Sequence, residues 1–253
     1  MITFSLQSGS NGNSIYVEAG DVRLLFDAGI SGKQAALRMA SHGRDIRHCD
    51  ALIISHDHSD HTRSAGIFQR KFDLRIYITE PTYRVVRSYL GPVNDVRTFR
   101  AGERLAFRDV TVHTIPAPHD GVDTVCFVVE HDSKRLGIFT DLGHPFAALR
   151  TAVESVDAAY LESNYDPEML RSGPYPDWLK ARIAGAGGHL SNLEAAELLG
   201  RPAARKLRWA AIAHLSEENN RPEIALETHR RRLGNSFPLR LAPRYEASEV
   251  LEI

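Results

Sequence analysis

The heptapeptide SHDHSDH, which begins at Ser55, places three histidines and two aspartates within seven positions. His56, His58, Asp60 and His61 directly follow the apolar run ALII, which is typical of a buried β-strand. Imidazole and carboxylate groups are the usual ligands of zinc, manganese and iron at catalytic centres. A tight loop at a strand end can direct two imidazoles to one point and the Asp-His pair to another. The spacing therefore favours a metal site over a solvated polar loop with a chance cluster of histidines.

Four residues supply only part of the ligands that two metal ions need, so the other ligands must come from elsewhere in the chain. Three further stretches place a metal-binding side chain at the end of an apolar run: VTVHTIPAPHD contains His119, LGIFTDLG contains Asp141, and RWAAIAHLS contains His214. Strand ends at one edge of a sheet converge on a common rim, where α/β proteins usually have their active sites. We therefore expect these three side chains beside the histidine cluster.

The amino-acid composition is typical of a soluble globular protein. The 253 residues are 43% hydrophobic and 25% charged, as in a soluble globular protein with a sizeable core. The formal net charge of -1 excludes a polyanion-binding tail but not a local basic surface. Cys49 and Cys126 lie in or beside apolar runs and are expected to be buried free thiols. We find no signal-peptide pattern and no apolar run near the roughly 20 residues that span a bilayer, so we expect a cytoplasmic protein without a membrane partner.

Short strands and helices alternate along the chain without a repeat or linker, which predicts one mixed α/β domain over residues 1–253. A hairpin is expected at Gly20-Asp21. The expected strands are residues 1–7, 14–20, 21–29, 51–55, 74–79, 96–100, 103–107, 110–115, 124–130, 134–140, 157–163 and 208–216, with short strands at the end of the chain. The expected helices are 30–43, 62–72, 81–91, 144–155, much of 166–200 and 222–233.

The pattern H-x-H-x-D-H, followed by His, Asp and His at strand ends, resembles that of the metallo-β-lactamase-fold hydrolases. Asp27 in LLFDAG matches the early structural aspartate of that superfamily, which supports the site from behind the ligands. The resemblance covers nearly the whole chain and implies a four-layer αββα sandwich of two mixed sheets packed face to face. It also implies two divalent metal ions, zinc or manganese, with iron as a further option. The implied ligands are His56, His58 and His119 for the first ion, Asp60, His61 and His214 for the second, and Asp141 as the bridge.

Longer motifs are similar to those of the YycJ/WalJ subgroup, which is associated with 5′-to-3′ exonuclease activity on DNA. They are SGSNGNSIYVEAG, FDAGIS, PAPHD, FTDLGH, LESNYD, GPYPDWLKARIAGAGGHLSN and AHLSEENNRPE. Tyr165 departs from the subgroup, because a histidine is expected after LESN. The interval from Asp141 to His214 leaves no room for the inserted cap domain of the β-CASP nucleases. The resemblance thus implies an exodeoxyribonuclease with an open site for DNA strand ends.

Candidate catalytic and phosphate-binding residues surround the implied metal site. Asp60 and His189 are the predicted catalytic residues, and His189 can bind the scissile phosphate or donate a proton to the leaving oxygen. The loop SGSNGNS can present backbone amides and the Asn13 side chain to a phosphate. The alternative for His189 is a histidine whose hydrogen bonds are satisfied within its own loop. The alternative for SGSNGNS is a flexible turn. Ser191 is a candidate substrate contact or a helix cap.

Two more groups of residues complete the predicted substrate path. Lys180 and Arg182, with aromatic residues nearby, can form a cationic strip for single-stranded nucleic acid, although an amphipathic helix with a solvated basic side is equally compatible. Asn164 and Asn219 follow strand ends; Asn164 is a further candidate substrate contact, and Asn219 is expected to orient a ligand by hydrogen bonding. The remaining histidines are expected to be non-functional, and four of them solvated: His42, His48, His131 and His229.

Two other function classes stay open from the sequence. The chain can be a hydrolase of a small phosphodiester, a lactone or a thioester, which would turn over a chromogenic ester much faster than DNA. It can also be a regulatory binding protein whose metal site only holds the fold. The sequence does not indicate the physiological metal or the oligomeric state.

Overall fold

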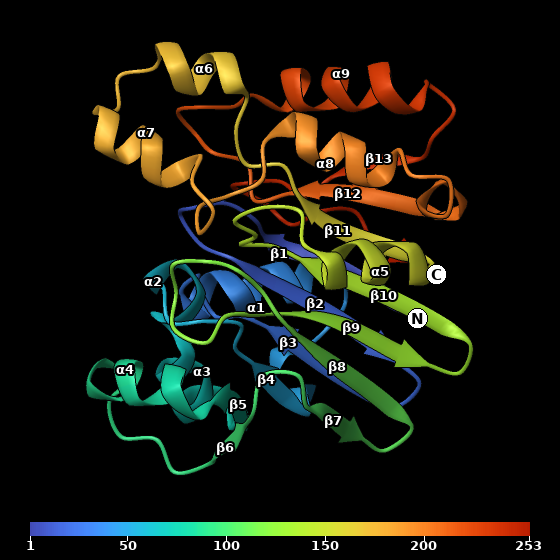
Figure 1. Cartoon of the computed structure of the whole chain (residues 1–253). Coiled ribbons are helices and arrows are strands. Elements are labelled where there is room, and N and C mark those ends of the chain that lie inside the picture. The colour runs from blue at the N-terminus through green and yellow to red at the C-terminus, as the bar shows by residue number, and fades with distance from the viewer.

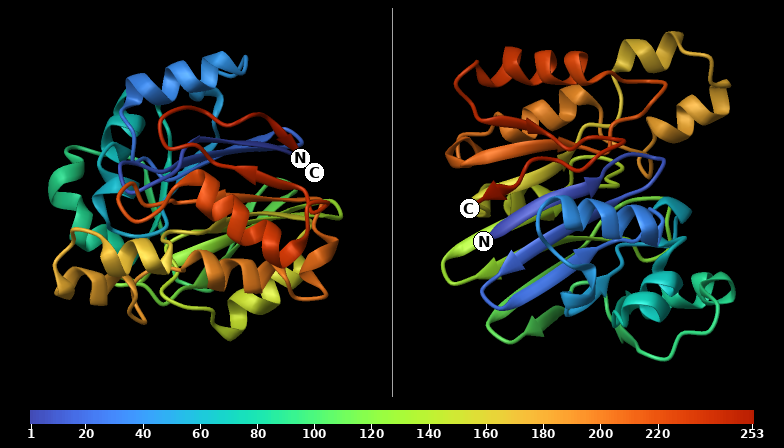
Figure 2. Two further views of the ribbon diagram at one scale, coloured as in Figure 1. Left: turned by 90° about the horizontal axis from the view of Figure 1, so that it is seen from above. Right: turned by 180° about the vertical axis from the view of Figure 1, so that it is seen from behind.

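Two β-sheets of seven strands each pack face to face, and helices cover the outer face of both (Figure 1). The computed structural model describes residues 1–253. Figure 2 shows the layers edge-on in its left view, with the two sheets between an outer layer of N-terminal helix and an outer layer of C-terminal helices. The four-layer αββα arrangement implied by the resemblance is confirmed.

The first sheet has the strand order β14-β1-β2-β3-β4-β5-β6. Its pairs are antiparallel from β14 to β3 and parallel from β3 to β6. The strands are β1 (Ile2–Gln7), β2 (Ser14–Ala19), β3 (Val22–Phe26), β4 (Ala51–Ile53), β5 (Ile76–Thr79), β6 (Val96–Phe99) and β14 (Leu251–Glu252). The helices of this half are α1 (Gly32–Ser41), the 3₁₀ helix η1 (Ile46–His48), α2 (Ser59–Thr62), α3 (Ala65–Phe72) and α4 (Glu80–Leu90).

The second sheet repeats this plan with the order β13-β12-β11-β10-β9-β8-β7. Its pairs are antiparallel from β7 to β10 and parallel from β10 to β13. The strands are β7 (Arg104–Phe107), β8 (Val110–Pro116), β9 (Val125–His131), β10 (Lys134–Phe139), β11 (Ala158–Glu162), β12 (Trp209–Ala213) and β13 (Leu239–Leu241). The helices are α5 (Ala147–Ser155), α6 (Pro167–Ser172), α7 (Asp177–Ile183), α8 (Asn192–Leu199), η2 (Ala204–Lys206) and α9 (Pro222–Leu233).

Alternation of side chains along each strand divides the interior into three apolar layers. In β3, Leu24 and Phe26 face the layer between the two sheets, whereas Leu25 faces α1 and α3. In β9, Phe127 faces the same central layer, and its ring centroid lies 5.0 Å from that of Phe26. Val128 of β9 faces the helices of the second half. Strands with both faces buried explain why these runs are almost continuously apolar in the sequence.

The structure corrects several details of the sequence-based expectations. The strand expected to end at Ser55 ends at Ile53, and the second half of the histidine cluster lies on the short helix α2 rather than in a loop. His229 was expected to be solvated but is completely buried within α9, where its Nδ1 lies 2.9 Å from the carbonyl oxygen of Ala225. The hairpin at Gly20-Asp21 and both buried free cysteines are confirmed. None of the helices is both long enough and apolar enough to cross a lipid bilayer.

Candidate metal centre

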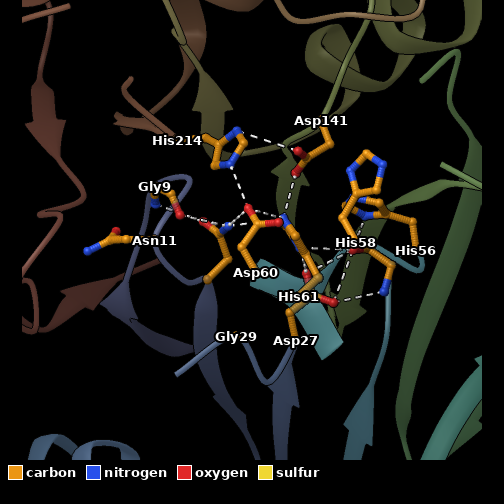
Figure 3. Close-up of polar contacts among 12 residues, drawn as sticks. Gly9, Asn11, Asp27, Gly29, His56, His58, Asp60, His61, Asp141 and His214 are labelled. Carbon is orange, nitrogen blue, oxygen red and sulfur yellow. Dashed lines mark hydrogen bonds and ion pairs between the residues drawn. The ribbon is translucent and has the colours of Figure 1, made fainter. Parts of the chain in front are cut away.

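The site lies where parallel strands of both sheets end. Asp27 follows β3 and the histidine cluster follows β4, while Asp141, Glu162 and His214 stand at the ends of β10, β11 and β12. Figure 3 shows how the labelled histidine and aspartate side chains converge from these ends. Because strands of both packed sheets end at this rim of the sandwich, residues far apart in the sequence come within hydrogen-bonding distance.

A close backbone approach fixes the position of α2. The amide of Asn13 donates to the carbonyl oxygen of Asp60 at 2.8 Å, and the amide of Ala28 donates to that of His61 at 2.7 Å. A Cβ atom at Gly29 would lie 1.6 Å from the carbonyl oxygen of Asp60. Only glycine therefore allows the loop after β3 to pack against the helix that carries two of the predicted ligands.

The first group of predicted ligands is His56, His58 and His119, whose ligand atoms lie within 4.8 Å of one another. Nδ1 of His58 is 3.2 Å from Nε2 of His119. The Nδ1 atoms of the other two face away from the centre: that of His119 lies 2.9 Å from the carbonyl oxygen of Gly188, and that of His56 lies 2.9 Å from Ser55 Oγ. Nε2 of His56 is buried without a hydrogen-bond partner.

The second group is Asp60, His61 and His214. Oδ2 of Asp60 lies 3.5 Å from His61 Nε2 and 3.6 Å from His214 Nε2. Asp27 supports this group, because its Oδ2 lies 2.7 Å from His61 Nδ1 and its Oδ1 accepts from the amide of Ser55 at 2.8 Å. Asp27 thus links the ends of β3 and β4 to the imidazole of His61.

Asp141 lies between the two groups. Its Oδ2 is 3.2 Å from His61 Nε2, and its Oδ1 is 3.5 Å from His214 Nδ1 and 3.8 Å from His119 Nε2. The carboxylate is buried, yet Oδ2 accepts no hydrogen bond, and Nε2 of His214 likewise has no partner. Buried polar atoms normally have partners. Orphaned nitrogen and oxygen atoms that face one small space therefore fit divalent metal ions.

Glu162 is the main residue of the site that sequence reasoning missed. It is completely buried, and its Oε1 lies 2.7 Å from His189 Nδ1 and 3.0 Å from His214 Nδ1. Its Oε2 accepts from the amides of Leu142 at 2.8 Å and Leu190 at 3.1 Å. One carboxylate thereby orients two imidazoles and joins three loops. The only sequence signal was a charged residue at the end of an otherwise apolar strand.

Three of the site residues have left-handed backbone conformations. Asp27, Asp141 and His214 have φ values of 63°, 59° and 55°. This region costs a residue with a side chain roughly 1–2 kcal/mol. The strain turns each chain sharply at the strand end, so that the side chain points along the edge of the sheet into the site. Such strain is typical of functional positions.

The charges of the buried groups are strongly perturbed. Burial alone would raise the pKa of Asp60, but the His61 and His214 imidazoles hold it below its ordinary value. Burial opposes the charged form of His214, yet Asp141, Asp60 and Glu162 raise its pKa to about 10. Burial and the neighbouring imidazoles lower the pKa of His56, so that it is neutral at pH 7. Neutral imidazoles and ionised carboxylates are the forms that bind metal, so His214 would lose its proton when an ion binds.

The predicted substrate contacts, together with Asn219, which was expected to orient a ligand, divide into two sets. Asn13, Asn164, Ser191 and Asn219 are all buried. The Nδ2 group of Asn13 donates to the Gly9 carbonyl at 3.0 Å and to Asp60 Oδ2 at 3.2 Å. Asn164 donates to the carbonyl of His214, and Ser191 caps α8 in a capping box. Asn219 contacts Ser216 and no ligand. In the structure these side chains hold loops rather than line the open pocket.

His189 and Arg182, by contrast, line the pocket above the two groups of ligands. The pocket has a volume of about 130 Å³. Oδ2 of Asp120 pairs with Arg182 Nε at 2.5 Å, and its Oδ1 lies 3.4 Å from His58 Nε2. Arg182 is the only lysine or arginine in the lining. Lys180 is not part of the pocket, because its Nζ donates to the carbonyl of Arg171 at 2.9 Å.

Residues 22–208 match the family model described as the β-lactamase superfamily domain. The chain is 36% identical to the exodeoxyribonuclease WalJ of Streptococcus pneumoniae over 87% of this chain and 83% of that protein. It is 32% identical to the exodeoxyribonuclease YycJ of Bacillus anthracis over 87% of this chain and 84% of that protein. The solved structure of the metallo-β-lactamase-fold protein YhfI from Bacillus subtilis covers 99% of both chains, with a TM-score of 0.77 and 17% identity. The chain therefore belongs to the β-lactamase superfamily, in the group that contains WalJ and YycJ.

Proposed function

We propose that this protein is a metal-dependent exodeoxyribonuclease that degrades DNA from the 5′ end. One observation is the main support for this proposal. Six imidazole and carboxylate side chains form two groups, and the Asp141 carboxylate lies near a histidine of each, in a chain that is 36% identical to an exodeoxyribonuclease. The polarity rests on the resemblance to the YycJ/WalJ subgroup.

We propose that His56, His58 and His119 hold one divalent ion, and that Asp60, His61 and His214 hold a second, with Asp141 between them. Bound ions of this kind supply the Lewis acidity that stabilises negative charge on a phosphodiester. Zinc and manganese both suit this set of nitrogen and oxygen donors, and iron is a further option.

The remaining polar groups of the pocket have separate roles in this proposal. The Arg182 guanidinium binds a non-bridging oxygen of the scissile phosphate. His189 donates a proton to the leaving oxygen, because Glu162 engages its Nδ1 and leaves Nε2 as the free ring nitrogen. Asn13 and Asn164 act on the substrate indirectly, by holding Asp60 and the backbone of His214.

The decisive test is degradation of DNA labelled at the 5′ or the 3′ end, and of matched RNA, with added manganese or zinc. We expect mononucleotides to be released from 5′ ends of DNA. Asp141→Asn should abolish this release, and His189→Ala should lower kcat while metal content stays unchanged. Release only from 3′ ends, or only from RNA, would refute the proposed polarity or substrate.

The two rival functions are separate outcomes of the same experiment. Turnover of bis(p-nitrophenyl) phosphate, a lactone or a thioester far above any DNA cleavage would indicate a hydrolase of small esters. Tight nucleic-acid binding without turnover, unaffected by His61→Ala, would indicate a regulatory binding protein. We further propose one domain over residues 1–253 without an inserted cap, and a cytoplasmic location, which suits two buried free thiols.

A further inference from the structure

A second and larger cavity lies beside the candidate metal centre. It has a volume of about 650 Å³, against about 130 Å³ for the pocket above the metal centre. The smaller pocket is lined almost entirely by polar and charged side chains, which suits a phosphate group better than a nucleobase. The larger one falls within the range of roughly 300–1,000 Å³ that is typical of small-ligand sites.

Two stretches of chain contribute residues to the lining of both cavities, so the cavities lie next to each other. Ser10 lines the small pocket and Ser8 the large one, and likewise His214 lines the small pocket and Leu215 the large one. The amide of His214 donates to Ser8 Oγ at 2.8 Å, so the two stretches are joined. Gly9, between the two serines, is linked to Asp60 through Asn13, whose Nδ2 group donates to the carbonyl of Gly9 and to Asp60 Oδ2 (Figure 3). A group bound at the metal centre therefore lies one residue away from the larger cavity.

Arg244 forms the wall between the large cavity and the loop that contains Gly9. Its Nη1 donates to the carbonyl of Leu215 at 2.8 Å, and its Nη2 pairs with Glu217 at 3.2 Å. A Cβ atom at Gly9 would lie 2.6 Å from Nη1, so the glycine makes room for the guanidinium. Because Glu217 neutralises Arg244, this part of the cavity suits an uncharged group better than an anion.

Tyr245 presents an exposed aromatic ring that is held in place. The residue is 61% exposed and lines the cavity. Its hydroxyl donates to Glu217, its carbonyl accepts from Arg38, and the Arg244 guanidinium lies 5.8 Å from the ring centroid. A ring fixed in this way loses little entropy when another flat group stacks on it.

We propose that the large cavity binds the nucleobase of a nucleotide next to the scissile phosphate, with Tyr245 as the stacking surface. Aromatic platforms of this kind accept any base, since every base has a π-face. Arg221 stands at the rim, exposed and without an ion pair, where it can meet the phosphate of the following nucleotide. The inference rests on the proposed function, because it assumes a nucleic-acid substrate.

The test combines Tyr245 variants with oligonucleotides that carry one abasic residue at the first, second or third position from the degraded end. On intact DNA, Tyr245→Ala should lower kcat/KM about 5- to 140-fold, as expected for the loss of one stacked base. Tyr245→Phe, the matched control, keeps the ring, so its kcat/KM on intact DNA should stay close to that of the parent. On the substrate that lacks the base bound in this cavity, kcat/KM of the parent should fall by the same factor. On that substrate Tyr245→Ala should not lower kcat/KM further.

The failure of this inference is distinct from the failure of the proposed function. If the parent degrades DNA and Tyr245→Ala has no effect, or has the same effect at every abasic position, the base subsite is refuted and the exonuclease stands. If the parent degrades no DNA but hydrolyses bis(p-nitrophenyl) phosphate, the proposed function fails first. An equal loss in Tyr245→Phe and Tyr245→Ala would assign the effect to the hydroxyl and also refute stacking.

Discussion

At the scale of single residues, the site depends on side chains that hold other side chains. Glu162 is the clearest case, because one of its oxygens faces two imidazoles and the other accepts two backbone amides. Burial opposes ionisation of Glu162, yet the His189 and His214 imidazoles hold its pKa below its ordinary value. A neutral amide in its place has one acceptor oxygen and must turn an N–H group toward another donor.

Glu162→Gln should therefore lower metal affinity or kcat/KM about 10- to 100-fold, the usual effect of losing a carboxylate that orients metal-binding histidines. The measurement is metal content after dialysis together with kinetics on DNA. Glu197→Gln, an exposed glutamate on α8, is the matched control. Full metal content and unchanged kinetics in Glu162→Gln would show that the two imidazoles keep their orientation without the carboxylate.

Arg182 and Lys180 lie two positions apart but should differ in function. Arg182 lines the pocket at the metal centre, whereas the ammonium of Lys180 donates a hydrogen bond to the carbonyl of Arg171 in α6. Arg182→Gln should reduce the salt dependence of DNA binding by about 0.7 in the slope of log K against log salt, the value for one phosphate contact on a single strand. Lys180→Gln should leave the slope nearly unchanged. Equal slopes in the two variants would contradict this division.

At the scale of elements, α9 buries a titratable group that plays no part in the site. His229 is completely buried, and burial lowers its pKa to about 4. In the unfolded chain an ordinary histidine has a pKa near 6.5. The neutral form is thus favoured in the folded state, so its contribution to stability is full above pH 6.5 and is lost as pH falls toward 4.

The free energy of unfolding should fall by about 2 kcal/mol between pH 7 and pH 5 through His229 alone, at 1.36 kcal/mol per pKa unit. His229→Leu should lack this part of the pH dependence. Denaturant unfolding of both proteins, prepared with the same metal content, gives the difference directly. His48→Gln is the control, since His48 is exposed. Parallel pH profiles for the parent and His229→Leu would contradict the buried neutral histidine.

At the scale of the whole molecule, the site joins the edges of two sheets. The histidine cluster belongs to the first sheet, whereas His119, Asp141 and His214 belong to the second. Metal bound there would connect both halves, and removing it would leave several buried carboxylates and imidazoles close together. Anything that binds only the folded state stabilises it, by ~4 kcal/mol at a free concentration of 1,000 Kd.

Chelation should therefore lower the Tm of the metal-loaded protein by several degrees, and added zinc or manganese should restore it. Asp141→Asn should show a much smaller shift, because the residue between the two groups of ligands no longer carries its charge. Differential scanning calorimetry with and without chelator measures both. The same Tm in both conditions would contradict a metal that bridges the sheets.

The sequence by itself indicated the candidate ligand types, their positions at strand ends and a mixed α/β domain, because alternation and apolar runs are local properties that survive in one dimension. The αββα arrangement followed from the resemblance to the metallo-β-lactamase-fold hydrolases. Only the tertiary structure decided which side chains meet. Asn13 reaches Asp60, Glu162 reaches two histidines from other elements, and His229 is buried by its neighbours. Such contacts depend on the packing of two sheets against each other. The packing of one sheet on the other leaves no periodic pattern along the chain, so a buried glutamate and a surface glutamate look alike in the sequence.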